Sequence, residues 1–114
     1  MANIYKGTEV KFKVELTAEG FSMDNNDFDI EVVSPRGSVT GSKTGSIADN
    51  NVTSNGNGVV IFKESNSWYA IADTTDLAKG DLRVIATARI PDTNADDGIR
   101  NDVAVASLGT LVIP

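Results

Sequence analysis

Carboxylates in two polar turns are the side chains of this sequence that are best suited to chemistry. The first turn, Asp92–Gly98, reads DTNADDG and places oxygen ligands at alternate positions, as calcium loops do. Its candidate metal ligands are Asp92, Asn94, Asp96 and Asp97. The glycine comes one residue late for an EF-hand, however, and no glutamate stands at the bidentate position. We therefore prefer to interpret this segment as a solvated turn between strands.

A second acidic turn, Asp24–Asp27, reads DNND. It could share a cation with the first turn if both turns met at one end of the fold, because a hard cation such as calcium needs several oxygen ligands. Calcium is thus the one cofactor that the residues suggest. The sequence by itself does not bring the two turns together.

Catalytic groups of the common kinds are missing from the sequence. It contains no His and no Cys, which excludes a Ser-His-Asp arrangement, a thiolate nucleophile and most zinc sites. A carboxylate pair for glycoside hydrolysis needs a buried acid of raised pKa beside an ionised partner in a cleft. No motif marks such a pair. We therefore predict no catalytic residues and expect a protein that binds or builds.

An aromatic pair is the best candidate for contact with a partner. Trp68 and Tyr69 are adjacent, so on a strand their side chains point to opposite faces. The outward ring could stack on a sugar or anchor a protein partner. In the alternative interpretation, which we favour, both rings cover the ends of the core, because large aromatic side chains are mostly buried.

The elements that position these side chains are predicted to be strands. Val10–Leu16 alternates apolar and charged residues, which is the period of a half-buried strand. Gly109 is expected to mark a bulge near the end of the chain. Periodicity and β-rich composition predict the other strands: Phe28–Val32, Val59–Phe62, Ser67–Ala72, Leu82–Ile90, Ile99–Ala106 and Leu108–Ile113.

The stretch 38–58 is rich in Ser, Thr, Gly and Asn. It offers only Val39, Ile47 and Val52 to a core, so we predict a short edge strand and a polar, flexible loop. Asp76–Gly80 is expected to form a single helical turn, ended by Gly80, at a corner between sheets. Many short strands and no helical period predict an all-β fold, an antiparallel β-sandwich of immunoglobulin-like architecture without a disulfide.

Length and charge narrow the class of protein further. The 114 residues suit one domain over residues 1–114, with one core. The net charge of −6 and the scattered Lys and Arg residues argue against nucleic acid as a partner. No run of residues is apolar enough for a membrane span or a signal peptide, so we expect synthesis in a cytoplasm and no membrane partner.

Three segments together resemble a known group of proteins. They are Ala2–Phe12 (ANIYKGTEVKF), Val60–Thr74 (VIF…WYAIADT) and Ala86–Asn101 (ATARIPD…DGIRN). These segments resemble small β-sandwich virion structural proteins, of the capsid auxiliary (decoration) or head-fibre type, from tailed phages of gut Bacteroidetes, including the crAss-like group. The resemblance spans most of the chain outside the region 38–58.

The resemblance implies a virion component that docks on the capsid shell and is made in the host cytoplasm. Its expected partner is the major capsid protein or another virion protein, bound by many symmetric copies through loops and an exposed strand edge. A tail, baseplate or connector component is an alternative within the virion. A carbohydrate-binding or adhesin module that uses Trp68 or Tyr69 is an alternative function from a different class of protein.

Overall fold

The computed structural model describes residues 3–44, 53–54 and 58–113. Every regular element in this part of the chain is a β-strand, and none is a helix, as the alternating apolar pattern predicts. The strands are β1 (Asn3–Tyr5), β2 (Glu9–Val14), β3 (Phe28–Val33), β4 (Ser38–Thr44), β5 (Thr53–Ser54), β6 (Val59–Glu64), β7 (Ser67–Asp73), β8 (Gly80–Pro91) and β9 (Ile99–Val112).

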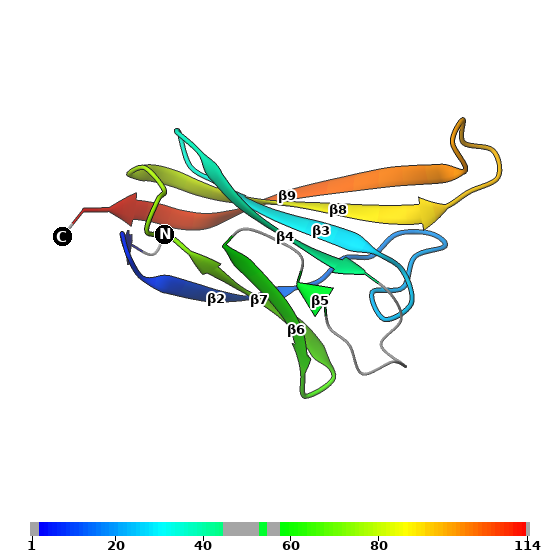
Figure 1. Ribbon diagram of the computed structural model, residues 1–114, viewed down its shortest axis with the longest axis horizontal. Coiled ribbons are helices and arrows are strands. Elements are labelled where there is room, and N and C mark those ends of the chain that lie inside the picture. Colours follow the sequence, from blue (N-terminus) through cyan, green and yellow to red (C-terminus); the bar gives the residue numbers. More distant parts are fainter. Residues whose placement is uncertain (1–2, 45–52, 55–57, 114) are drawn as a thin grey trace.

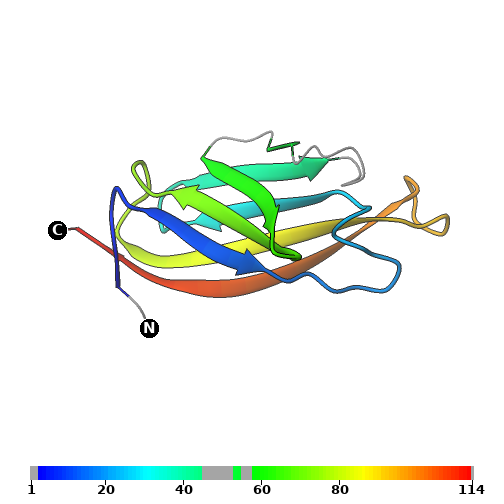
Figure 2. The same ribbon diagram turned by 90° about the horizontal axis from the view of Figure 1, so that it is seen from below.

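The strands form two sheets of unequal width (Figure 1). The wide sheet has six strands in the order β1-β9-β8-β3-β4-β5, and the narrow sheet has three in the order β2-β7-β6. All neighbours pair antiparallel except β1 and β9, which pair parallel. The narrow sheet lies across one face of the wide sheet (Figure 2), so the predicted all-β class is confirmed as a sandwich-like arrangement.

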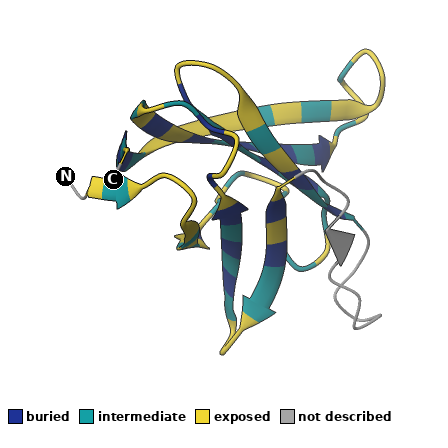
Figure 3. Ribbon diagram, turned by 60° about the vertical axis from the view of Figure 1, so that its left-hand side comes forward, coloured by how far each residue is buried: buried dark blue, intermediate teal, exposed yellow. Residues whose placement is uncertain are grey.

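One apolar core lies between the sheets. Inward-facing residues of β3 and β7 alternate with exposed or half-buried ones, as the period of a strand requires (Figure 3). Phe28, Ile30 and Val32 on β3 are each 0% exposed. From the narrow sheet they are covered by Trp68, Ala70, Val59 and Ile61. Both sheets therefore depend on the same core.

The long β8–β9 hairpin matches the prediction with one change. The sequence suggests two final strands, whereas the structure has one continuous strand from Ile99 to Val112. Leu82 pairs with Gly109 and Arg83 with Ser107, so Leu108 is the extra residue of a bulge beside Gly109. The bulge lets a single strand change direction where two were expected. The bulge predicted at Gly109 is confirmed.

The corner between the sheets lies where it was predicted, after β7. The chain leaves the narrow sheet and enters the wide sheet through a turn, not through a helical turn. Leu77 is 1% exposed there and anchors the corner in the core. Its backbone N–H donates to the Thr74 carbonyl oxygen at 3.1 Å.

In the region 38–58 the structure differs from the prediction. Ser38–Thr44 is a full strand that pairs with β3 along its length and with β5 at its end, so it is not the short edge strand that composition predicts. It also contributes Gly41 and Lys43 to the interior, in addition to Val39. Ile47, Val52 and most of the predicted flexible loop lie outside the described residues.

Gly41 allows β4 to approach the narrow sheet closely. A Cβ atom at this position would collide with the carbonyl oxygen of Val59 on β6 and would lie 3.0 Å from the Val59 Cβ. The nearest obstacle is backbone, which cannot rotate away as a side chain can. Only glycine therefore fits at this crossing of β4 and β6.

We predict that Gly41→Ala destabilises the fold. Overpacking of this kind should lower the free energy of unfolding by about 1–3 kcal/mol, measured by urea denaturation. Thr40→Ala, at the exposed neighbouring position on the same strand, is the control and should change stability little. Equal stability of Gly41→Ala and the wild type would show that the sheets can separate without cost at this point.

Candidate interaction surfaces

The outer face of the β8–β9 hairpin carries exposed apolar side chains. Val105 pairs with Ile85, and Val103 pairs with Thr87, on the side of the wide sheet that faces away from the core. Val103 is 61% exposed and Val105 is 58% exposed. We call Ile85, Thr87, Val103 and Val105 the hairpin outer face. Large apolar side chains at this exposure are typical of contact surfaces when they lie together.

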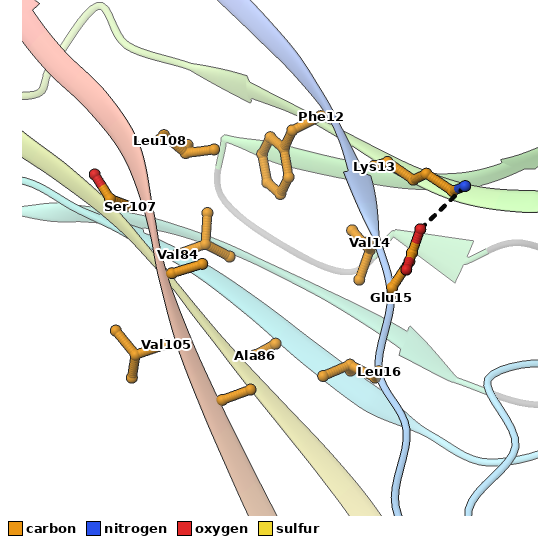
Figure 4. Close-up of a pocket in the computed structure, with 12 residues that line it drawn as sticks. Phe12, Lys13, Val14, Glu15, Leu16, Val84, Ala86, Val105, Ser107 and Leu108 are labelled. Carbon is orange, nitrogen blue, oxygen red and sulfur yellow. Dashed lines mark ion pairs between the residues drawn. The ribbon is translucent and has the colours of Figure 1, made fainter. Parts of the chain in front are cut away.

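A groove opens on the other side of β9, between this strand and β2 (Figure 4). Its cavity volume is about 320 Å³. Val84 and Ala86 of β8 form the floor, and the walls are residues 12–16 and 104–108. Figure 4 shows Val105 pointing away from this space. We call it the open groove.

The structure places the two predicted aromatic contacts on opposite faces, as the strand period requires. Trp68 is 5% exposed, packs edge-to-face on Phe28 at a centroid distance of 5.6 Å and donates its Nε1–H to Asp24 at 2.8 Å. Tyr69 lies half-buried on the outer face of the narrow sheet, stacked on Phe62 at 5.9 Å. A contact role for this pair would therefore belong to Tyr69.

The ring faces of this outer aromatic pair are partly occupied by the protein itself. Lys11 Nζ lies 4.8 Å from the centroid of Tyr69 and 5.3 Å from that of Phe62. Such a cation–π contact uses the face on which a sugar ring would stack. This geometry favours a structural role for the aromatic pair over a sugar platform.

The acidic loop at the tip of the β8–β9 hairpin uses its oxygens to hold its own turn. Asp92 Oδ1 accepts the backbone N–H of Asn94 at 2.9 Å, and its Oδ2 lies 3.4 Å from Arg100 Nε. Asp97 Oδ1 accepts the N–H of Ile99 at 3.2 Å. Asp96 is exposed. Among the described residues, no group of three or more acidic side chains is arranged to hold a metal ion.

The second acidic turn lies at the same end of the molecule as this loop, because Asn25, Asn26 and Asp27 line one hollow together with Pro91 and Ile99. Asp24 itself is turned toward the narrow sheet. Its carboxylate accepts hydrogen bonds from Lys63 Nζ at 2.9 Å and from Trp68 Nε1 at 2.8 Å. The hydrogen bond from Lys63, followed by that from Trp68, lowers the pKa of Asp24.

Lys43 is a buried cation that sequence reasoning missed. Its side chain is 0% exposed. Its Nζ donates to the main-chain oxygens of Asn26 at 2.9 Å and Asp24 at 3.4 Å. It also lies 5.9 Å from the ring of Phe28 and 5.8 Å from that of Trp68. Desolvation lowers the pKa of Lys43, and Asp27 and Asp24 partly oppose that shift.

One signal in the sequence could have identified this lysine. Val39, Gly41 and Lys43 share one face of a period-two strand, and Val39 is the apolar member of that set. Lysine normally stays at the surface, so composition argues against placing it inward. Among the described residues, the turn 24–27, which folds over the end of β4, supplies the oxygens that make burial tolerable.

We predict that Lys43 makes stability depend on alkaline pH. Because its pKa is lowered in the folded protein, the unfolded chain binds more protons between that pKa and 10.5. The free energy of unfolding of the wild type should therefore rise with pH in this window, relative to Lys43→Met. Urea denaturation followed by Trp68 fluorescence between about pH 7 and 10.5 measures this difference.

The exposed Lys79 provides the matched control. Lys79→Met should follow the pH dependence of the wild type, and Lys43→Met should not. At neutral pH, Lys43→Met should remain folded with a free energy of unfolding within about 2 kcal/mol of the wild type, since a well-packed apolar replacement can match a buried charge. Parallel pH curves for Lys43→Met and the wild type would contradict this prediction.

We predict that calcium does not stabilise the protein. The oxygens of Asp92 and Asp97 already accept backbone N–H groups or face Arg100, so a cation would have to displace these contacts. The melting temperature should be the same with millimolar calcium, millimolar magnesium or a chelator. A rise in melting temperature that is specific to calcium, and that Asp97→Asn removes, would restore the calcium hypothesis.

No protein-family model matches this chain, and comparisons with curated proteins and with solved structures find no significant match. Residues 3–44, 53–54 and 58–113 include no candidate for a membrane-spanning helix.

Proposed function

We propose that this chain is a non-enzymatic virion structural protein of a tailed phage, a capsid auxiliary (decoration) or head-fibre-associated protein that docks on the capsid shell. Three sequence segments resemble virion structural proteins of tailed phages, and this resemblance motivates the proposed virion role. The geometric observation that supports docking is the hairpin outer face, where Val103 and Val105 are 61% and 58% exposed on a regular strand. Two adjacent apolar side chains on a rigid strand are suited to a protein contact.

A rigid support is what makes this face suitable for repetitive docking. β8 pairs with β3 on one side and with β9 on the other, so Ile85 and Thr87 are fixed by two ladders. Arg83 and Arg89 flank them on the same face, and Arg89 is held by Asp29 at 2.8 Å. The proposed contact thus has an apolar centre and a polar rim, as protein interfaces commonly do.

Multiple copies would strengthen a contact of this size. A patch made of a few side chains is small for a stable interface, which buries about 800 Å² on each partner. Copies attached at symmetry-related positions act together, so weak individual contacts give firm collective attachment. We propose the major capsid protein or another virion protein as the partner, and neither nucleic acid nor a membrane.

We further propose that the sandwich has immunoglobulin-like architecture of the variable type. In that architecture the strands C′ and C″ extend the sheet formed by G, F and C. The order β9-β8-β3-β4-β5 fits G-F-C-C′-C″, and β2-β7-β6 fits B-E-D. In this assignment, no described strand occupies the position of strand A beside β2.

The proposal is tested by mixing the protein with purified shells of the encoding phage and measuring co-sedimentation. The wild type should sediment with shells, and the double variant Val103→Asp with Val105→Asp should lose at least about 10-fold in affinity, because charge replaces the apolar centre of the contact. The double variant should also keep the wild-type melting temperature, since both side chains are exposed.

Val60→Asp is the matched control, because Val60 is also an exposed apolar strand residue, 52% exposed, but lies on the narrow sheet. It should bind shells as the wild type does. Failure of the wild type to sediment with shells would reject the capsid role, and ring-shaped assemblies of the isolated protein would favour a tail or connector component. Equal loss in Val60→Asp and in the double variant would reject the hairpin outer face as the contact.

A further inference from the structure

The open groove is bordered by a strand edge that no described strand pairs. β2 pairs with β7, and the order of the narrow sheet leaves its other edge without a neighbour among the described strands. Thr74 N–H donates to the Thr8 carbonyl oxygen, and alternate residues of an antiparallel strand bond to the same neighbour. The backbone groups of Glu9, Lys11 and Lys13 therefore point away from β7, toward the open side of the sandwich.

The groove beside this edge has the shape and chemistry of a strand site. Phe12 and Leu16 line one wall, and Leu108 lies at the head of the other (Figure 4). Residues 12–16 and 104–108 run along it for about five residues, or roughly 17 Å of extended chain. Side chains at alternate positions of an added strand would reach the apolar floor, while its backbone would bond to β2.

The exposed inner face of β9 indicates that no part of the chain within residues 3–44, 53–54 and 58–113 fills the groove. Ala104 and Ala106 face the same way as the buried Val84 and Ala86 with which they pair, yet both are exposed. The narrow sheet ends at β2 and does not reach across them. An added strand beside β2 would cover this apolar surface, as the rest of the narrow sheet covers β3 and β8.

The charges on β2 specify the outward-facing side chains of such a strand. Along its solvent face the edge reads Glu9, Lys11, Lys13 and then Glu15. Lys13 Nζ forms an ion pair with Glu15 Oε1 at 3.0 Å, and Lys11 Nζ forms one with Glu64 Oε1 at 3.1 Å. Both lysine side chains are about half exposed. Opposite charges directly across two strands stabilise their pairing, and like charges oppose it. The complementary strand thus carries acidic residues opposite the lysines and basic residues opposite the glutamates.

A second copy of the chain fits this site less well than a single strand. The wide sheet extends past β2 with β9, and the far end of the β8–β9 hairpin projects beyond the narrow sheet (Figure 1). Another sandwich approaching through its own β2 would bring its own β9 to the same side. The two β9 strands would then compete for one space, whereas an extended segment has no second sheet.

We propose that the open groove accepts an extended segment of a partner protein as an added strand along β2, with aliphatic side chains facing the groove and acidic side chains opposite Lys11 and Lys13. The identity of the partner as a virion protein rests on the proposed function. The groove, the free edge and the charge pattern do not depend on it. The segment is held through its backbone and read by its alternate side chains.

Two synthetic peptides of identical composition test the proposal. The capped peptide Lys-Val-Glu-Val-Glu-Val-Lys matches the charge order of β2 in either chain direction, and Glu-Val-Lys-Val-Lys-Val-Glu inverts it. The first peptide should bind at least about 5-fold more tightly in NMR titrations, because four cross-strand charge pairs change sign. Saturation with it should slow hydrogen exchange at the amides of Glu9, Lys11 and Lys13, which lie on the edge of β2 that no described strand pairs.

Variants of the groove locate the binding site. Ala104→Trp fills the groove from an exposed position and should weaken binding of the first peptide about 10-fold or more. Thr40→Trp adds the same bulk at an exposed position elsewhere on the wide sheet and should bind as the wild type does. Lys13→Pro removes one outward N–H from the edge strand β2, where proline is tolerated. In this variant the first peptide should no longer slow hydrogen exchange at the amide of Lys11.

The outcomes separate this proposal from the proposed function. Equal binding of both peptides, unchanged exchange at the β2 amides, or protection of β9 amides alone would overturn the strand site, even if the protein sediments with shells. Dimerisation that protects the β2 amides without peptide would also overturn it, in favour of a second copy. Selective binding of the first peptide would support the strand site, even if shells do not bind and the virion role fails.

Discussion

A narrow sheet covers a wider one, and most features of this molecule depend on that inequality. The buried faces of β3 and β7 require the two sheets to pack on a shared core. Three strands cannot cover six, so the inner face of β9 extends beyond the core. Ala86, beneath β2, is 6% exposed, while its partner Ala104 on the next strand is exposed. The same apolar pattern thus gives a core where it is covered and a groove where it is not.

The two ends of the sandwich are closed by different means. At one end Leu77 anchors the corner between the sheets by burial, and Thr74 and Ala78 add hydrogen bonds to Thr8 and Ser34. At the other end the turn 24–27 joins them through polar contacts, since Asp24 accepts from Lys63 and Trp68 of the narrow sheet while Lys43 of the wide sheet donates to its carbonyl oxygen. A buried cation costs less when oxygens and aromatic faces surround it. The carboxylate of Asp24 thus stabilises the contact between the sheets, which leaves it less suited to binding a metal ion.

The strand β9 connects the functional proposals to each other. Its outer side chains Val103 and Val105 form the hairpin outer face, and its inner side chains Ala104 and Ala106 border the open groove. Strand periodicity makes these two surfaces independent, because adjacent side chains point to opposite sides. One partner could therefore contact the outer face while an extended segment occupies the groove.

The sequence by itself determined the class of fold and the position of most strands, because an alternation such as Val10 to Leu16 depends only on the period of an extended chain. It also determined that neither His nor Cys is available for chemistry. Tertiary structure alone decided that Lys43 is inside and that Ala104 is outside, reversing what each residue type prefers. Both reversals have one physical reason. Whether a side chain is buried depends on which distant segment of the chain lies over it, and the alternation of apolar residues along a strand does not contain that information.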